Sequence, residues 1–80
     1  MKTLTVILEK KITIEKKEIT FTAEIAQYET KRDGKFITID TEDMGNEFLA
    51  NFRRRNKNIS MVQAVGIVKS QGYSECNKIA

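Results

Sequence analysis

An unbroken alternation of apolar and polar residues over positions 19–25 limits the possible folds of this chain more than any other feature. The apolar residues of this stretch all fall on one parity: Ile19, Phe21, Ala23 and Ile25. Successive side chains of a β-strand point to opposite faces, so such alternation is typical of a half-buried strand. We therefore expect a strand over residues 18–28, with Phe21 at the centre of the core.

A second apolar series comes before this strand and has the same period of two. Its members are Leu4, Val6, Leu8, Ile12 and Ile14. We expect a strand over residues 3–15 and a turn at Lys16-Lys17. Ile14 then lies opposite Ile19 and Leu8 opposite Ile25, so the apolar sets of both strands share one face. Lys10 would lie opposite Ala23.

A third strand is expected over residues 35–40, after a turn that contains Asp33-Gly34. Glycine at this place is free to adopt a positive φ. If Gln27 pairs with Ile37, then Tyr28 lies opposite Phe36 on the other face of the sheet. The three strands would form an antiparallel meander.

Two helices are expected in the second half of the chain, over residues 42–55 and 60–71. The first has Asp40 or Thr41 as its N-cap and carries an apolar stripe at helical spacing. That stripe consists of Met44, Phe48, Leu49 and Phe52. The second helix opens with a Ser60–Gln63 capping box and stops at Gly72. We expect the tail, residues 74–80, to be frayed.

The expected fold is therefore α+β: a three-stranded antiparallel β-meander followed by two α-helices packed on one face, in the order β-β-β-α-α. Residues 1–80 are expected to form a single domain, because a chain of 80 residues has room for only one small core. No apolar run approaches the ~18 residues of a membrane helix, and the start does not resemble a signal peptide. A single cysteine, Cys76, cannot form an internal disulfide. We expect a cytoplasmic location.

The composition argues against an enzyme. Histidine is absent, which removes the commonest general base and the commonest nitrogen ligand of zinc. Cys76 therefore has no histidine partner to activate it. Asp40, Glu42 and Asp43 are oxygen donors of the type that Mg²⁺ prefers, but acids also favour the start of a helix. We expect no cofactor and no metal, and leave open whether these three residues bind a cation.

Two groups of residues are candidates for binding nucleic acid, and the net charge of +3 permits such a partner. The first is a basic run at the end of the first helix: Arg53, Arg54, Arg55 and Lys57. The second combines aromatic residues with cations in the neighbouring turn: Tyr28, Phe36, Lys31 and Arg32. Each group also has a structural explanation, since cations stabilise helix C-termini and aromatic residues pair across strands.

The sequence therefore favours a small, non-enzymatic, intracellular binding protein with nucleic acid as its partner. The alternative is a protein-binding regulator or inhibitor of the small kind that phages and mobile elements encode. The second helix has a broad apolar surface, so we also expect a homodimer. Its contact would include Val62, Val65 and Ile67.

Overall fold

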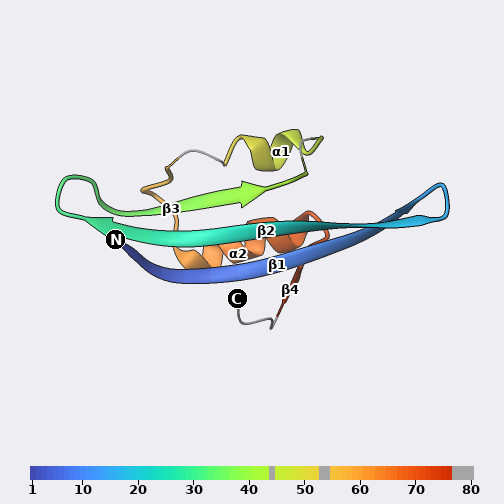
Figure 1. The fold of residues 1–80 in the computed structure, drawn as a ribbon. Coiled ribbons are helices and arrows are strands. Elements are labelled where there is room, and N and C mark those ends of the chain that lie inside the picture. The colour runs from blue at the N-terminus through green and yellow to red at the C-terminus, as the bar shows by residue number, and fades with distance from the viewer. Residues whose placement is uncertain (44, 53–54, 77–80) are drawn as a thin grey trace.

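The computed structural model of the protein describes residues 1–43, 45–52 and 55–76 (Figure 1). It has an α+β fold with a four-stranded antiparallel sheet in the order β3-β2-β1-β4 and two helices. The elements are β1 (Lys2–Ile14), β2 (Lys17–Thr30), β3 (Gly34–Thr41), α1 (Glu47–Ala50), α2 (Met61–Ser70) and β4 (Ser74–Glu75). Among the described residues, no helix has the length and apolar character needed to cross a membrane.

The hairpin between β1 and β2 turns at Glu15-Lys16, not at Lys16-Lys17. Both turn residues have positive φ, 50° and 66°, which is the geometry of a tight two-residue hairpin. The predicted register was therefore wrong by two positions: Ile14 lies opposite Lys17, and Ile12 lies opposite Ile19. An even shift keeps every side chain on its predicted face.

The pairing of β2 with β3 was predicted correctly. Gln27 pairs with Ile37, and Tyr28 pairs with Phe36. Gly34 opens β3 with a φ of +69°, which explains why glycine occupies this position. The turn is closed on its other side by Thr30, whose Oγ1 accepts a hydrogen bond from the Asp33 amide at 2.9 Å.

The core lies between one face of the sheet and both helices. Its buried members are Leu8, Ala23, Ile25, Ile37, Ile39, Leu49, Ala64, Val68 and Tyr73. Ile25 is fully buried and lies between Val6 and Ile39 on the neighbouring strands. Phe21 was predicted to be central but is only half-buried. It lies opposite Lys10, in the part of the β1–β2 hairpin that extends past β3.

The first helix is much shorter than the predicted span of residues 42–55. Asn46, not Asp40 or Thr41, is its N-cap, and its side chain accepts a hydrogen bond from the Leu49 amide at 3.0 Å. Asp40 and Thr41 instead belong to β3. Leu49 and Phe52 reach the core as predicted, whereas Phe48 is exposed. Met44 lies outside the described residues.

The second helix begins as predicted. The Ser60 hydroxyl accepts a hydrogen bond from the Gln63 amide, and the Gln63 side chain accepts one from the Ser60 amide, which completes the capping box. Gly72 follows the C-cap residue Gln71 with a φ of +91°, so it provides the predicted stop. Ala64 and Val68 are the buried residues of this helix.

The segment after α2 contradicts the prediction of a frayed tail and of three strands. Ser74 and Glu75 form β4, which pairs with Glu9 and Leu8 of β1. The Cys76 amide continues this pairing with a hydrogen bond to the Ile7 carbonyl at 2.9 Å. Two residues are too few to show an alternating pattern, so this strand could not be predicted from the sequence.

Tyr73, just before β4, makes a buried hydrogen bond that should affect stability at alkaline pH. Its hydroxyl lies 3.0 Å from the Thr41 hydroxyl. Burial raises the pKa of Tyr73 above its ordinary value, and the nearby Asp43 carboxylate adds to this effect. A raised pKa in the folded state means that stability is fully present below about pH 10 and is lost as the pH rises further.

We therefore expect Tyr73→Phe to lower the free energy of unfolding by about 1 kcal/mol at neutral pH, through loss of the hydrogen bond. Above about pH 10 the parent should lose stability more steeply than the variant, which has no phenol to ionise. Urea unfolding at several pH values measures both effects. Parallel pH profiles for the two proteins would contradict the assignment.

Candidate nucleic-acid interface

The predicted aromatic pair lies on the face of the sheet that the helices do not cover. Tyr28 of β2 and Phe36 of β3 are directly opposite each other, with ring centroids 5.3 Å apart and an interplanar angle of 12°. This is a stacked cross-strand pair, of a kind that stabilises sheets. Tyr28 is half-buried, whereas Phe36 is only 6% exposed.

Two cations extend this pair into a row across four neighbouring chain segments. The Lys2 Nζ of β1 lies 5.9 Å from the Tyr28 ring centroid, and the Arg55 guanidinium carbon lies 4.7 Å from that of Phe36. Arg55 reaches this position because Asn56 forms a β-bridge with Ile37 alongside β3. We call Lys2, Tyr28, Phe36 and Arg55 the outer row. Cations over aromatic faces are attracted by the ring quadrupole.

The cations of the outer row also pair with acids. Lys2 Nζ lies 2.9 Å from Glu24 Oε1, and the hydrogen bond and charge of this carboxylate raise the pKa of Lys2. Arg55 Nη1 donates to Asp33 Oδ2 at 2.6 Å. The outer row therefore helps to hold the sheet together. Because Arg55 covers Phe36, Tyr28 is the ring of the pair that retains a partly exposed surface.

Further cations surround the outer row at the end of the sheet that carries the β2–β3 turn. Lys57 lies 4.0 Å from the second oxygen of Asp33 and remains largely exposed. Lys31 and Arg32 are exposed in the turn, and Lys35 is exposed at the start of β3. Among the described residues, five cations and three acids lie on or beside the outer face here. The cations are Lys2, Lys31, Arg32, Arg55 and Lys57, and the acids are Glu24, Asp33 and Asp40, whereas Lys35 and Glu29 pair on the other face.

The structure thus brings two separately predicted groups to one place. Arg55 and Lys57 of the basic run lie beside Tyr28 and Phe36, although the sequence placed them in different surfaces. Arg53 and Arg54, also predicted to bind, lie outside the described residues. Lys2 was not predicted, although the partial exposure of its side chain and its place opposite Tyr28 make it part of the same surface.

The three residues of the predicted dimer contact do not form one exposed surface. Val62 is 82% exposed. Val65 and Ile67 are half-buried and pack against the core. The broad apolar surface of α2 therefore serves mainly to cover the sheet, and a contact through these residues stays a prediction.

The remaining polar candidates do not form a metal site in the part of the chain that the structure describes. No group of three or more His, Cys, Asp or Glu side chains there is arranged to hold an ion. Asp40 and Glu42 are exposed, and Asp43 is half-buried. The Cys76 thiol lies 3.3 Å from Glu9 Oε1.

Comparison with known proteins gives no family for the chain. No family model matches it, and no curated protein or solved structure is significantly similar to it.

The sequence contains no signal that points to Lys2. The register set by the two-residue turn would bring Lys2 opposite Glu29, but an irregularity between Lys2 and Leu4 shifts the pairing and places Lys2 opposite Tyr28. Asp33 gave no signal either. Asp33 forms ion pairs with both Arg55 and Lys57. These pairs form because the segment after α1 lies beside the β2–β3 turn, which the sequence does not predict.

Proposed function

We propose that this chain is a small, non-enzymatic nucleic-acid-binding protein that binds a single strand at the β2–β3 end of its outer face. The observation that supports this most is the half-buried Tyr28 ring, flanked by cations from β1, from the β2–β3 turn and from the segment after α1. Aromatic rings stack on unpaired bases, while nearby cations hold the phosphates.

The exposed cations of this surface suit phosphate groups. Lys31 and Arg32 form none of the ion pairs found among the described residues. The guanidinium of Arg32 can donate two hydrogen bonds to one phosphate. A sheet face with one partly exposed ring suits an unstacked base better than the edges of a closed duplex.

The test is fluorescence anisotropy with labelled single-stranded DNA, single-stranded RNA and a duplex. We expect the parent to prefer a single strand. Tyr28→Leu should weaken that binding about tenfold, because stacking on one base contributes ~1–3 kcal/mol. Leucine keeps an apolar contact with Phe36, so the sheet should remain folded.

Phe48→Leu is the matched control, since it removes another exposed aromatic ring, on α1, that is not part of the outer row. It should leave the affinity unchanged. If Tyr28→Leu binds as tightly as the parent, Tyr28 is not the stacking surface. If the parent binds none of the three probes at low salt, the proposed function is wrong.

The alternative is a protein-binding regulator or inhibitor. Val62 supports it, because a large apolar side chain that is 82% exposed is suited to a protein contact. The two functions differ in their response to salt. Phosphate binding weakens steeply as salt rises, whereas an apolar protein contact changes little.

A further inference from the structure

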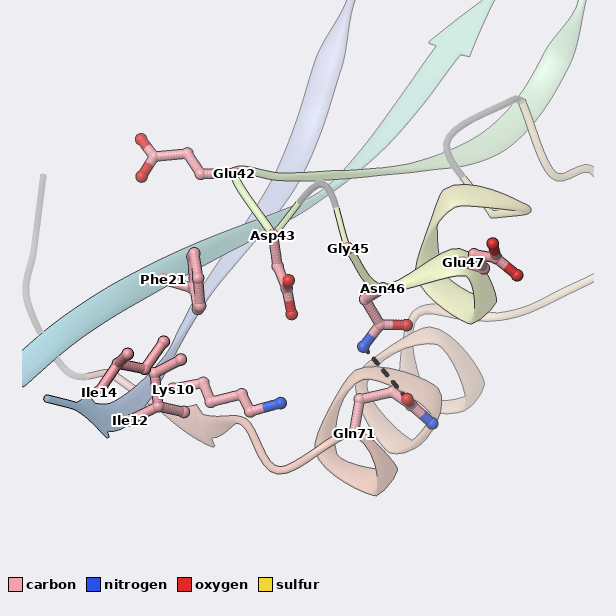
Figure 2. Close-up of a pocket in the computed structure, with 10 residues that line it drawn as sticks. All are labelled: Lys10, Ile12, Ile14, Phe21, Glu42, Asp43, Gly45, Asn46, Glu47 and Gln71. Atoms are coloured by element: carbon pink, nitrogen blue, oxygen red, sulfur yellow. Dashed lines mark hydrogen bonds between the residues drawn. The ribbon is translucent and has the colours of Figure 1, made fainter.

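A groove of about 730 Å³ lies on the helix side of the sheet, and its charged lining is mainly acidic. Three acids, Glu42, Asp43 and Glu47, line it together with one cation, Lys10. Figure 2 shows the Asp43 carboxylate and the Lys10 side chain pointing into this groove. A surface with more acids than cations repels a nucleic-acid backbone. The phosphates of a bound strand are therefore better placed on the outer face of the sheet.

One acid, Asp33, holds two of the cations beside the outer row. Its Oδ2 accepts a hydrogen bond from Arg55 Nη1 at 2.6 Å, and its Oδ1 lies 4.0 Å from Lys57 Nζ. The Asp33 side chain is 29% exposed, whereas that of Arg55 is 60% exposed. The acid is thus more sheltered from water than the cation, which strengthens their attraction.

The Asp33 carboxylate resembles a backbone phosphate in charge and in hydrogen bonding. A carboxylate and a phosphodiester each carry one negative charge and two oxygens that can accept from one guanidinium. A phosphate that approaches Arg55 therefore meets the repulsion of Asp33 as well as the attraction of the guanidinium. The two anions compete for one cation.

The position of Arg55 also closes off part of an aromatic ring. Its guanidinium carbon lies 4.7 Å from the ring centroid of Phe36. Arg55 comes from the side of β3 opposite to Tyr28, because the segment after α1 bridges that edge of the strand. Phe36, between the two, is only 6% exposed. Release of Arg55 would provide a cation for a phosphate and uncover part of this second ring for a base.

On the basis of the proposed function, we propose further that Asp33 is an internal competitor of the nucleic-acid backbone. It occupies Arg55 in place of a phosphate and so limits the affinity of the outer face for a single strand. The β2–β3 turn tethers Asp33 beside Arg55, so its effective concentration is higher than that of a free strand. Arg55 therefore stays with the acid in the parent, whereas Lys57, at 4.0 Å, is held more loosely and can contact a phosphate.

The test is fluorescence anisotropy of Asp33→Asn with a labelled single strand. We expect this variant to bind about tenfold more tightly than the parent at low salt, because Arg55 gains a phosphate contact. The slope of log K against log salt concentration should become steeper by about 0.7, the value for one further contact. Asparagine before Gly34 suits a tight turn as well as aspartate does, so circular dichroism should show a folded variant.

Asp40→Asn is the matched control. It removes one negative charge from the outer face of the same strand region, and Asp40 forms none of the ion pairs among the described residues. General attraction between a basic protein and nucleic acid would rise equally in both variants. We expect Asp40→Asn to change the affinity less than about twofold, because it releases no cation.

Arg55→Gln, made in the parent and in Asp33→Asn, shows whether the gain depends on Arg55. In the parent it should weaken binding only about twofold, because the acid already occupies this cation. In Asp33→Asn it should weaken binding about tenfold and return the affinity to that of the parent. Such non-additivity is the signature of two side chains that act on each other.

An Asp33→Asn variant that binds no more tightly than Asp40→Asn would overturn this competition. So would equal effects of Arg55→Gln in the two backgrounds. Weaker binding by Asp33→Asn would also overturn it, since Asp33 would then position Arg55 for the strand. None of these results affects the proposed function, because the parent still binds, whereas a parent that binds no strand would overturn both.

Discussion

Ile25→Ala should lower the free energy of unfolding by about 3–5 kcal/mol. Ile25 is fully buried in β2, between Val6 on one neighbouring strand and Ile39 on the other. Removing most of its side chain loses the transfer free energy of the buried atoms and leaves a cavity beneath the helices. Domains of this size have a total stability of only about 4–12 kcal/mol, so the variant would be close to unfolding.

Ile19→Ala is the matched control, because it makes the same substitution on the same face of the same strand. Ile19 is 37% exposed in the part of β2 that extends past its pairing with β3, so the loss should be about 1 kcal/mol or less in the monomer. Urea unfolding of both variants, at concentrations low enough to avoid self-association, measures the difference. Equal losses would contradict the view that the core does not extend along β2 as far as Ile19.

The period of two in the sequence was enough to predict which residues face the core. It did so even though the predicted hairpin register was shifted, because a shift of two positions keeps the face. The period does not show how far the helices extend over that face. Phe21 and Ile19 have the same pattern as Ile25, yet Ile25 is fully buried, Phe21 is only partly buried against the core, and Ile19 is exposed. Their exposure could be found only once the length of α1 was known.

The candidate interface was predictable to the extent that it depends on neighbouring strands. Tyr28 and Phe36 were correctly placed opposite each other, because a short turn with Gly34 fixed their register. The position of Arg55 was not predictable. It depends on the bridge between Asn56 and Ile37, which joins segments far apart in the chain without any periodic pattern.

Reversing two cations of the candidate interface should have the largest effect on nucleic-acid binding. Arg32→Glu with Lys57→Glu changes the charge by four units at exposed positions beside Tyr28 and Phe36. We expect the affinity for a single strand to fall about 100-fold at low salt, since two phosphate contacts become repulsive. The fold should be retained, because neither side chain lies in the core.

Lys11→Glu with Lys69→Glu is the matched control, because it makes the same change in charge at exposed positions outside the candidate interface. General attraction between a basic protein and nucleic acid would weaken equally in both double variants. Binding at the proposed surface would weaken strongly only in the first. Anisotropy titrations at one low salt concentration distinguish these outcomes.

The dependence of single-strand affinity on salt tests the proposed function most directly. Each phosphate contact with a single strand contributes about −0.7 to the slope of log K against log salt concentration. Contacts from Lys31, Arg32 and Lys57 therefore predict a slope of about −2 for the parent. The Arg32→Glu, Lys57→Glu variant should have a slope of about −0.7, whereas the Lys11→Glu, Lys69→Glu variant should keep that of the parent. A parent affinity that does not change with salt would contradict binding of nucleic acid through this surface.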